Sequence, residues 1–422
     1  MISRRGFIES STAAIGAASL AHHVAADDAA KLPAAIRALQ PMTPDVVPIS
    51  DDERRARMER ARKLMVDNGF DAVFIEPGTT MSYFTGVSWG TSERMFALVL
   101  PAKGEPAFIC PAFEEARARE VIRFSNDIRL WQEDENPGAL VAQVIRDRGL
   151  TTQRIGIEQR ARFFLADLIR AATPAADLRI ADSVTTGCRM IKSPAELAIL
   201  KRANEITLAA MKATFATMKE GMTQDELGNN MAAAYRKLGV PGHKGGPQFG
   251  QYSAYPHGSK EPQKLREGDI VLLDDGITLE GYVSDITRTT VYGKPTARQR
   301  QVWELEQRAQ KAALDAAKVG VPCEAVDAAA RKVITDAGFG PGYKVPGLPH
   351  RTGHGIGMDV HEAPNLERGN KMPLAPGMCF SDEPMIAIYG EFGIRLEDCW
   401  HMTENGPVTF TPLSPSIEIP VA

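Results

Sequence analysis

The sequence has few cysteines, no excess of basic residues and no long apolar run in its body. Of 422 residues, five are cysteine, and they include no CxxC pair. The odd count and the spacing argue against a disulfide framework or a zinc knuckle. The net charge is −4, so the chain has no broad basic surface and we expect no nucleic-acid partner. Behind the N-terminus, no segment approaches the length of a membrane span.

The N-terminus has the pattern of an export signal. Arg4 and Arg5 are adjacent, a mildly apolar stretch covers residues 11–21, and small residues offer cleavage after position 21 or 25. This pattern predicts a twin-arginine signal peptide over residues 1–26, and a periplasmic or secreted protein. The alternative is a chance arginine pair on a tail. The apolar stretch is too short and too rich in Ala, Ser and Gly to cross a bilayer, so we expect no membrane association after cleavage.

The remaining chain divides into two parts. Residues 26–50 are rich in Ala, Pro and Asp and predict a linker. Residues 51–184 alternate short apolar strands with helices, which is typical of a mixed α/β domain. This part contains no cluster of acids, histidines or nucleophiles, so we interpret it as a scaffold or specificity domain. A boundary at residues 184–193 precedes a second domain over residues 188–422.

The elements follow from apolar periodicity and from capping residues. In the first domain we expect helices at 51–68, 112–123, 138–148 and 161–171 and strands at 71–76, 95–101, 106–111, 128–132, 154–158 and 178–181. In the second we expect helices at 194–220, 224–238, 297–319 and 323–337 and strands at 270–275, 281–290, 378–383 and 394–402. Ser193 with Glu196, and Thr223 with Glu226, form capping boxes at two of these helix starts.

Five potential metal ligands follow one another through the second domain. Four are carboxylates and one is an imidazole, a set that suits a pair of divalent cations better than a lone structural zinc. They are Asp274 in LLDDG, Asp285 in VSDITRT, His354 in HRTGHGIGMDVHE, Glu383 in SDEP and Glu397 in GIRLED. Any one of them alone could be structural, but the ordered set points to a metal centre.

The spacing of the ligands predicts how they meet. Asp274 and Asp285 are eleven residues apart, on two apolar strands that an antiparallel hairpin would place face to face. Glu383 and Glu397 lie on two further predicted strands, and His354 lies in a Gly-flanked loop. Converging acids are costly unless cations neutralise them. Bridging carboxylates could hold two metals about 3.5–4 Å apart and lower the pKa of a bound water to about 7, which prepares it for hydrolysis.

These motifs resemble those of the pita-bread metallopeptidase family over residues 188–404. The family includes methionine aminopeptidase, Xaa-Pro aminopeptidase and prolidase, with creatinase as a non-metal relative. Residues 51–184, with TTMSYFTGVSWGTSER at 79–94, also resemble the N-terminal domain of creatinase, prolidase and Xaa-Pro aminopeptidase. Methionine aminopeptidases lack that domain and creatinase lacks the metal ligands. The resemblance therefore implies the Xaa-Pro dipeptidase (prolidase) or Xaa-Pro aminopeptidase branch, and an α+β fold in which a smaller α/β domain precedes a pita-bread catalytic domain.

The resemblance also implies roles for the ligands. All five match the dinuclear metal ligands of the family, with Asp285 and Glu397 bridging the two ions. Glu383 would also act as general base on a metal-bridging hydroxide. Two divalent metal ions per subunit are implied. Carboxylate-rich sites favour Mn²⁺, while Zn²⁺, Co²⁺ and Fe²⁺ are alternatives.

Further residues match positions that contact substrate in the family. His257 in YPHG would stabilise the oxyanion, and His361 in DVHE would contact the substrate carbonyl or carboxylate. His350 would line the pocket behind the scissile bond, and Arg395 would support the site electrostatically. Preorganised donors of this kind stabilise developing charge.

The sequence departs from the family beside these motifs. Asn365 stands where several prolidases have an arginine for the carboxylate of a dipeptide, and Arg368 is close enough to replace it. Asp382 stands where an apolar residue is usual. In the run EPMIAIYGEFGIR, unusual residues occupy three positions: Met385, Ala387 and Tyr389. These changes should reshape the pocket beyond the metals.

The function implied is metal-dependent hydrolysis of Xaa-Pro bonds, with a dipeptide as the expected substrate. A second reading is an Xaa-Pro aminopeptidase acting on longer peptides. A third is a lyase or C–N hydrolase acting on a small metabolite, because fold alone does not fix function. In relatives the N-terminal domain of one subunit caps the site of another, so the resemblance implies a homodimer.

Overall fold

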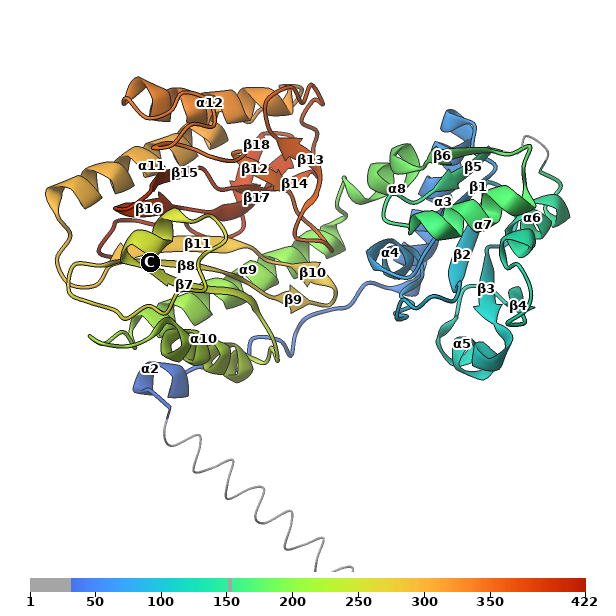
Figure 1. Ribbon diagram of the computed structural model, residues 1–422, viewed down its shortest axis with the longest axis horizontal. Coiled ribbons are helices and arrows are strands. Elements are labelled where there is room, and N and C mark those ends of the chain that lie inside the picture. The colour runs from blue at the N-terminus through green and yellow to red at the C-terminus, as the bar shows by residue number, and fades with distance from the viewer. Residues whose placement is uncertain (1–31, 151–153) are drawn as a thin grey trace, which may run out of the picture.

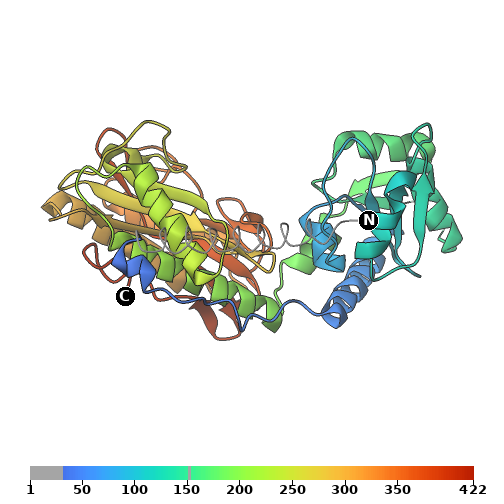
Figure 2. The same cartoon turned by 90° about the horizontal axis from the view of Figure 1, so that it is seen from below.

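The computed structural model describes residues 32–150 and 154–422, and the predicted signal peptide lies outside these ranges. The molecule has two lobes arranged along its long axis (Figures 1 and 2). The lobe built from the first half of the chain, from α3 to α8 and coloured blue to green, is smaller than the lobe that contains the C-terminal half. This arrangement agrees with the expected α+β architecture, a smaller α/β domain followed by a larger one.

The smaller lobe is a six-stranded sheet with helices on its faces, in the strand order β4-β3-β2-β1-β5-β6. Its strands are β1 (Ala72–Ile75), β2 (Ala97–Pro101), β3 (Ala107–Pro111), β4 (Ile128–Trp131), β5 (Arg154–Ile157) and β6 (Asp177–Ile180). Its helices are α3 (Asp51–Asn68), α4 (Thr79–Thr85), η1 (Ala112–Glu114), α5 (Glu115–Val121), α6 (Gly138–Asp147), α7 (Phe163–Ala172) and α8 (Asp182–Arg189).

The central strands of this lobe are apolar at every position because both of their faces are covered. In β1, Val73 and Ile75 pack into one apolar cluster while Ala72 and Phe74 pack into another on the opposite face. Successive side chains of a strand point to opposite sides, so a strand buried on both faces reads as a continuous apolar run.

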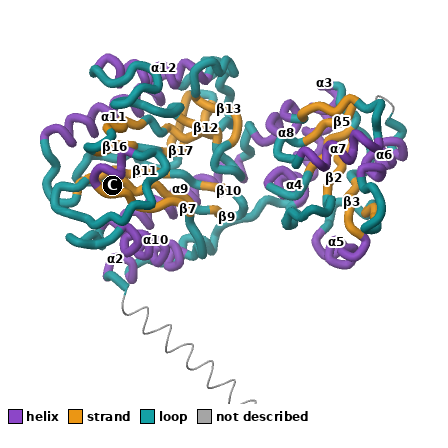
Figure 3. The backbone as a smooth tube through the Cα atoms, viewed as in Figure 1, coloured by secondary structure: helices purple, strands orange, loops and turns teal. Residues whose placement is uncertain are grey.

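The larger lobe packs strands between two pairs of helices (Figures 1 and 3). Helices α9 (Pro194–Phe215) and α10 (Gln224–Leu238) lie on one side of the strands, and α11 (Ala297–Ala316) and α12 (Cys323–Asp336) lie on the other. The strands of this lobe are β7 (Lys244–Phe249), β8 (Ile270–Gly276), β9 (Thr278–Leu279), β10 (Tyr282–Val283), β11 (Ile286–Val291), β12 (Gly353–Gly355), β13 (Glu362–Leu366), β14 (Cys379–Asp382), β15 (Met385–Ile388), β16 (Phe392–Arg395), β17 (Asp398–Thr403) and β18 (Gly406–Thr409). A short 3-10 helix, η2 (Gly250–Ala254), follows β7.

Several predicted boundaries are confirmed by cap geometry. The side chains of Ser193 and Thr223 each accept a hydrogen bond from the amide of the third helical residue, and the amide of each cap residue donates to the glutamate there, so both capping boxes are present. Gly69 and Gly239 end α3 and α10 in the left-handed conformation, which glycine adopts without a steric penalty.

Other predictions of local structure are wrong. Helices α4 and α8 lie in segments for which no helix was expected. The helix from 194 ends at Phe215 rather than near residue 220. The strand expected over 281–290 is interrupted after β10, and the one expected over 394–402 is interrupted after β16. At each of these interruptions the break in the pairing contains a predicted ligand, Asp285 or Glu397.

The prediction of a linker over residues 26–50 is wrong for its described part. Helix α2 (Ala34–Arg37) contacts α9 and α10, and Ile36 and Ile49 are buried in the apolar cluster of the larger lobe. The amide of Met42 donates to the carbonyl of Leu238 at 2.9 Å. The segment therefore packs on the larger lobe before the chain enters α3 of the smaller one (Figure 1).

All five cysteines are buried and free. Among the described residues, every helix is too short or too polar to span a bilayer.

Candidate metal centre

Asp274 and Asp285 come from neighbouring antiparallel strands. In the pairing of β8 with β11, Asp274 lies opposite Thr287, and Asp285 immediately precedes β11. The predicted hairpin is confirmed, with the difference that β9 and β10 form a small additional pair between the two strands. Residues 285 and 287 lie on the same side of the chain, so both face Asp274.

Glu383 and Glu397 lie at one end of a second antiparallel pair. Asp382, the last residue of β14, pairs with Asp398, the first residue of β17, so the two ligand glutamates extend from the same end. A bridge joins this sheet to the first one. The amide of Glu397 donates to the carbonyl of Thr287 at 3.0 Å, which brings Glu397 next to Asp274.

His354 lies on the short strand β12, so the expectation of a loop is wrong. Its amide donates to the Ser381 hydroxyl at 3.0 Å, and its Nδ1 lies 3.0 Å from the carbonyl of Gly355. A hydrogen bond from Nδ1 leaves Nε2 as the free nitrogen. Nε2 lies 3.1 Å from Glu383 and 3.7 Å from Asp285.

The donor set fits divalent cations. Ligand atoms of Asp285, His354 and Glu397 all lie within 4.8 Å of one another. Oε1 of Glu397 is buried and has no hydrogen-bond partner, a costly state for a carboxylate oxygen unless an ion binds it. Oxygen donors with one imidazole suit hard-to-borderline divalent ions. Asp285, His354 and Glu397, from separate segments of the chain, thus form a possible metal site.

The carboxylates lie so close together that they disfavour one another's ionisation, and bound cations would relieve this repulsion. Burial, with the charge of Asp274 as the next cause, raises the pKa of Asp285 to about 8. Burial and the charges of Asp285 and Glu383 raise the pKa of Glu397 well above its usual value. Burial opposes ionisation of Glu383 too, but its hydrogen bond with His354 lowers its pKa to about 2. Without cations Asp285 and Glu397 tend to hold protons near neutral pH, and bound cations would displace those protons.

Thr287 is a site residue that sequence reasoning missed. Its hydroxyl lies 2.6 Å from Oε2 of Glu397 and 3.0 Å from Oδ1 of Asp274, and it accepts a hydrogen bond from Arg395 at 2.9 Å. The signal available in the sequence was its position, two residues after Asp285 on the same strand face. Thr287 therefore holds two ligand carboxylates in place.

Arg395 is buried beside the ligands. Its guanidinium forms an ion pair with Asp274, lies 3.8 Å from Glu397, and donates to the carbonyl of Pro256 at 3.0 Å. This last bond places the following residue, His257, at the edge of the site. Arg395 thus contacts the carboxylates directly, in keeping with the electrostatic role expected for it.

The other two histidines lie on the segments around His354. The ring of His361 meets that of His354 edge-on, with centroids 4.3 Å apart. Burial, together with the positive neighbours His354 and Arg351, lowers the pKa of His361 to about 4, so the ring is neutral at neutral pH. His350 is partly buried, its Nδ1 lies 2.7 Å from the carbonyl of Arg351, and desolvation lowers its pKa.

Arg368 follows β13, the strand on which Asn365 lies opposite His354. Its guanidinium carbon lies 5.6 Å from the ring centroid of Tyr343. The Asn365 side chain donates to Glu367 at 3.3 Å. Arg368 thus lies just beyond the end of the strand that carries Asn365, beside Tyr343.

A buried polar layer lies behind the ligand glutamates. Arg288 is fully buried and binds both oxygens of Asp398, and it donates to the carbonyl of Glu397 at 2.8 Å. Gln310 of α11 donates to Asp398 at 3.1 Å and to the carbonyl of Leu396 at 3.2 Å. These bonds fix the backbone on both sides of Glu397, which limits the positions that its carboxylate can take.

Two family models match the chain. Residues 198–404 match metallopeptidase family M24, and residues 57–191 match the creatinase/prolidase N-terminal domain. The first match contains all five predicted metal ligands. The second contains the smaller lobe from within α3 to the end of α8, and stops in the connector between α8 and α9.

Individual relatives match over nearly their whole length. An Xaa-Pro dipeptidase of Lactobacillus delbrueckii subsp. lactis is 34% identical over 370 residues, which cover 86% of this chain and 98% of that protein. The crystal structure of dipeptidase PepE from Mycobacterium ulcerans superposes with a TM-score of 0.80 at 32% identity, covering 89% and 100% of the two chains. That of an X-Pro aminopeptidase from Thermotoga maritima MSB8 gives 0.71 at 28% identity, covering 85% and 99%.

Proposed function

Because the chain belongs to metallopeptidase family M24 and is a dipeptidase-like hydrolase of that family, we propose that its substrates are Xaa-Pro dipeptides. The observation that carries this proposal is the convergence of Asp285, His354 and Glu397 in a chain 34% identical to an Xaa-Pro dipeptidase. Membership of the family implies divalent metal ions and peptide substrates. The choice of Xaa-Pro over other dipeptides is the proposal.

We propose further that five residues hold two metal ions, with manganese as the expected metal. They are Asp274, Asp285, His354, Glu383 and Glu397. When bound, the ions supply a water activated for attack and positive charge for a carbonyl oxygen. Nε2 of His354 is the nitrogen free to ligate, because Nδ1 is directed at the carbonyl of Gly355.

The protein groups around the ions would handle protons and orient the peptide. Glu383 has its pKa held low by His354, so it is ionised at neutral pH and able to accept a proton from the attacking water. His361 is neutral there and can donate a hydrogen bond to the substrate. His257, beside Arg395, would stabilise the developing oxyanion, and His350 would line the pocket behind the scissile bond.

Proline suits such a site for a physical reason. An Xaa-Pro bond has no N–H, and its ring fixes the backbone, so enzymes that bind an extended peptide through its amide hydrogens handle it poorly. A site that activates its own water and encloses a small ring would not need that hydrogen.

Arg368 would bind the free carboxylate of a dipeptide, in place of the arginine that several prolidases have at the position of Asn365. A planar guanidinium binds a carboxylate through two parallel hydrogen bonds. Replacing Arg368 by Ala should weaken dipeptide binding by about 1.5–3 kcal/mol and therefore raise KM. Turnover should change less, because the metal ligands remain intact.

The test is a panel of Xaa-Pro dipeptides, Xaa-Pro-Yaa tripeptides and dipeptides without proline, assayed with the metal-loaded enzyme and with Arg368→Ala. The proposal expects preference for Xaa-Pro, and a rise in KM that is specific to dipeptides. The likeness to an X-Pro aminopeptidase favours the second candidate, cleavage of longer peptides. Preference of the wild-type enzyme for tripeptides would select that candidate, and faster cleavage of dipeptides without proline would refute both.

We also propose that residues 1–26 direct twin-arginine export and that the enzyme is a periplasmic or secreted homodimer. A folded reporter fused behind residues 1–30 should reach the periplasm of a suitable bacterium, and Arg4→Lys with Arg5→Lys should block it. Equal export of the double variant would refute the route. Sedimentation of the mature enzyme should give twice the chain mass, and a monomer would refute the dimer.

A further inference from the structure

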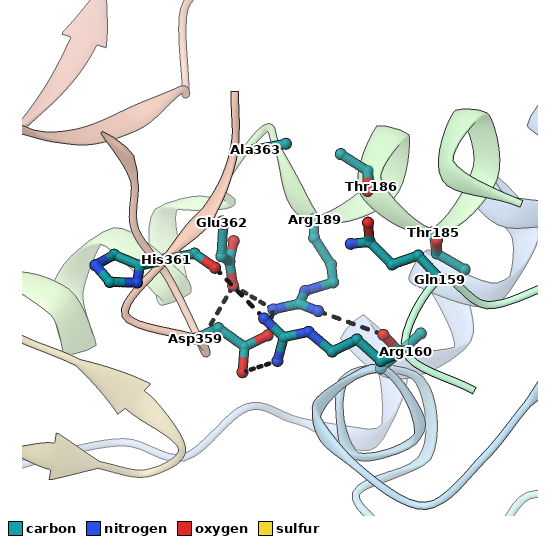
Figure 4. Close-up of a pocket in the computed structure, with 10 residues that line it drawn as sticks. Gln159, Arg160, Thr185, Thr186, Arg189, Asp359, His361, Glu362 and Ala363 are labelled. Atoms are coloured by element: carbon teal, nitrogen blue, oxygen red, sulfur yellow. Dashed lines mark hydrogen bonds and ion pairs between the residues drawn. The ribbon is translucent and has the colours of Figure 1, made fainter. Parts of the chain in front are cut away.

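The four-residue segment 359–362, which carries His361, is held by side chains of the smaller lobe. Asp359 and Glu362 flank the histidine and are both largely buried. Their partners lie on α4, on the turn after β5, on α8 and on the connector into α9. Figure 4 shows the cationic side chains of Arg160 and Arg189 converging on this segment. The groups line a small polar cavity of about 40 Å³ between the two lobes.

Arg189, at the end of α8, is the buried centre of the network. Its guanidinium binds Asp359 at 2.6 Å and also pairs with Glu362. Lys192 pairs with the other oxygen of Glu362 at 3.2 Å. The same carboxylate accepts a hydrogen bond from the amide of Asp359 at 3.0 Å, which closes the segment on itself. Nη2 of Arg189 makes both contacts, while Nη1 donates to the hydroxyl of Thr80 on α4 at 3.3 Å, so the guanidinium ties both carboxylates to the smaller lobe.

Arg160 and Thr79 add a second set of contacts from the smaller lobe. Arg160 binds Asp359 at 2.8 Å and donates to the carbonyl of His361 at 3.4 Å. The hydroxyl of Thr79 donates to Asp359 at 2.7 Å. The guanidinium of Arg160 thus contacts the main chain of His361 directly, while the Arg160 side chain remains half exposed.

The segment adjoins the metal centre. The His361 ring lies 4.3 Å, centroid to centroid, from that of the ligand His354. A shift of the smaller lobe that moves Asp359 and Glu362 would move His361 relative to His354. Displacements of about 1 Å in a positioned group are enough to lower a reaction rate strongly.

We propose that Arg189 and Arg160 are positioning residues: through Asp359 and Glu362 the smaller lobe of each chain holds His361 of the same chain against the metal centre. The contribution of the smaller lobe is therefore made within one chain, independently of any capping by a partner subunit. The kinetic consequence rests on the proposed peptidase function, whereas the ordering of the segment does not.

The test compares Arg160→Ala with the matched control Arg162→Ala. Arg162 lies in the same turn and is similarly accessible, but it pairs with Glu76 inside the smaller lobe. Amide hydrogen exchange is measured by mass spectrometry on the full-length, Zn²⁺-loaded protein. Arg160→Ala should speed exchange in residues 356–366 by up to about fivefold, the range for loss of one accessible ion pair. Exchange in residues 270–291, which contain Asp274 and Asp285, should not change.

Two further variants sharpen the comparison. Arg160→Lys keeps the charge and should restore most of the protection. Arg189→Lys keeps the charge but loses the bond to Thr80, so the cation is no longer fixed between the two carboxylates, and exchange in residues 356–366 should speed more than with Arg160→Ala; if that variant does not fold, Arg160→Ala decides. In the peptidase assay, Arg160→Ala should raise KM for the dipeptide by a similar factor, with metal content unchanged.

Equal exchange in residues 356–366 for Arg160→Ala and Arg162→Ala would overturn the proposal, and so would an increase spread evenly over both segments. If the protein hydrolyses no Xaa-Pro peptide, the exchange comparison still decides whether the smaller lobe orders His361, so failure of the proposed function is seen separately.

Discussion

At the residue scale, the metal centre depends on uncharged groups as much as on its ligands. Thr287 lies between Asp274 and Glu397, and Ser381 lies between the amide of His354 and the carboxylate of Glu383. A hydroxyl can accept from one group and donate to a carboxylate, so it links Arg395 or the amide of His354 to a predicted ligand without adding charge. Such outer groups commonly set how tightly a metal binds.

Replacing Thr287 by Val should weaken metal binding by about 10–100-fold, because the valine keeps the shape but loses the hydroxyl that contacts Asp274 and Glu397 and accepts from Arg395. Competition with a metal-binding dye measures the dissociation constant. Thr290→Val is the matched control, because Thr290 is buried on the same strand but donates to the carbonyl of Ile417, away from the ligands. Equal affinities for the two variants would show that Thr287 does not support the site.

Glu362 should make stability depend on acid pH. Burial opposes its ionisation, but Lys192 and Arg189 lower its pKa to about 2, from an ordinary value of 4.5. A lowered folded-state pKa stabilises the protein fully above pH 4.5, and that stabilisation disappears as pH falls towards 2. The shift corresponds to about 3 kcal/mol.

Urea unfolding at several pH values tests this expectation with Glu362→Gln. The variant should be less stable than wild type at pH 7, and the gap should narrow as pH falls below about 4. Asp359 remains to face Arg189 in the variant, so part of the network survives. A gap that stays constant from pH 7 to pH 3 would contradict the assignment.

At the scale of elements, the segment from Leu32 to Ser50 behaves as part of the larger lobe. Ile36 of α2 is fully buried between α9 and α10. Arg202 of α9 donates to the carbonyl of Met42 at 3.2 Å and pairs with Asp45 at 2.8 Å. A short helix with few internal hydrogen bonds depends on such packing for its stability.

Replacing Ile36 by Ala should therefore destabilise the larger lobe by about 2–5 kcal/mol, the usual cost of emptying a buried aliphatic site. Val47→Ala is the control, because Val47 is 76% exposed and should change stability by less than about 0.5 kcal/mol. Urea denaturation of both variants measures the difference. Equal midpoints would mean that the segment does not stabilise the lobe.

An element could be predicted from the sequence when the residues that determine it lie within the element or next to it in the chain. The capping boxes at Ser193 and Thr223 and the glycine at position 69 are local, and they located helix ends correctly. Helix α4 has no side-chain cap, and its buried residues face neighbours distant in sequence, so no local pattern marked it. The 32–50 segment was misassigned because Ala, Pro and Asp suggest a loop, whereas a few separated apolar side chains determine its docking.

The same distinction applies to the metal centre. The pairing of Asp274 with the strand after Asp285 followed from spacing and alternation, and the structure has that hairpin. The bridge between Thr287 and Glu397 joins two sheets, and neither sequence segment contains a sign of it. The ion pairs between Arg189 and the residues around His361 cross the lobes, so they too depend on the assembled fold.

At the scale of the whole molecule, the two lobes are connected twice. One connection is the segment that leaves α2 and enters α3, and the other runs from α8 through Lys192 into α9 (Figures 1 and 2). The second carries Arg189 and Lys192, the cations that hold Glu362. The smaller lobe contains none of the predicted metal ligands, yet its side chains reach the segment beside them.

The most direct test of the central claim measures Xaa-Pro dipeptide hydrolysis as a function of the metal ions bound per chain. Protein stripped with a chelator is titrated with Mn²⁺, bound metal is counted by elemental analysis, and Asp285→Ala is treated in parallel. Hydrolysis should be absent in the stripped protein, rise with bound metal towards two ions per chain, and stay absent in the variant. Full hydrolysis by wild-type protein that retains no divalent metal would contradict the claim.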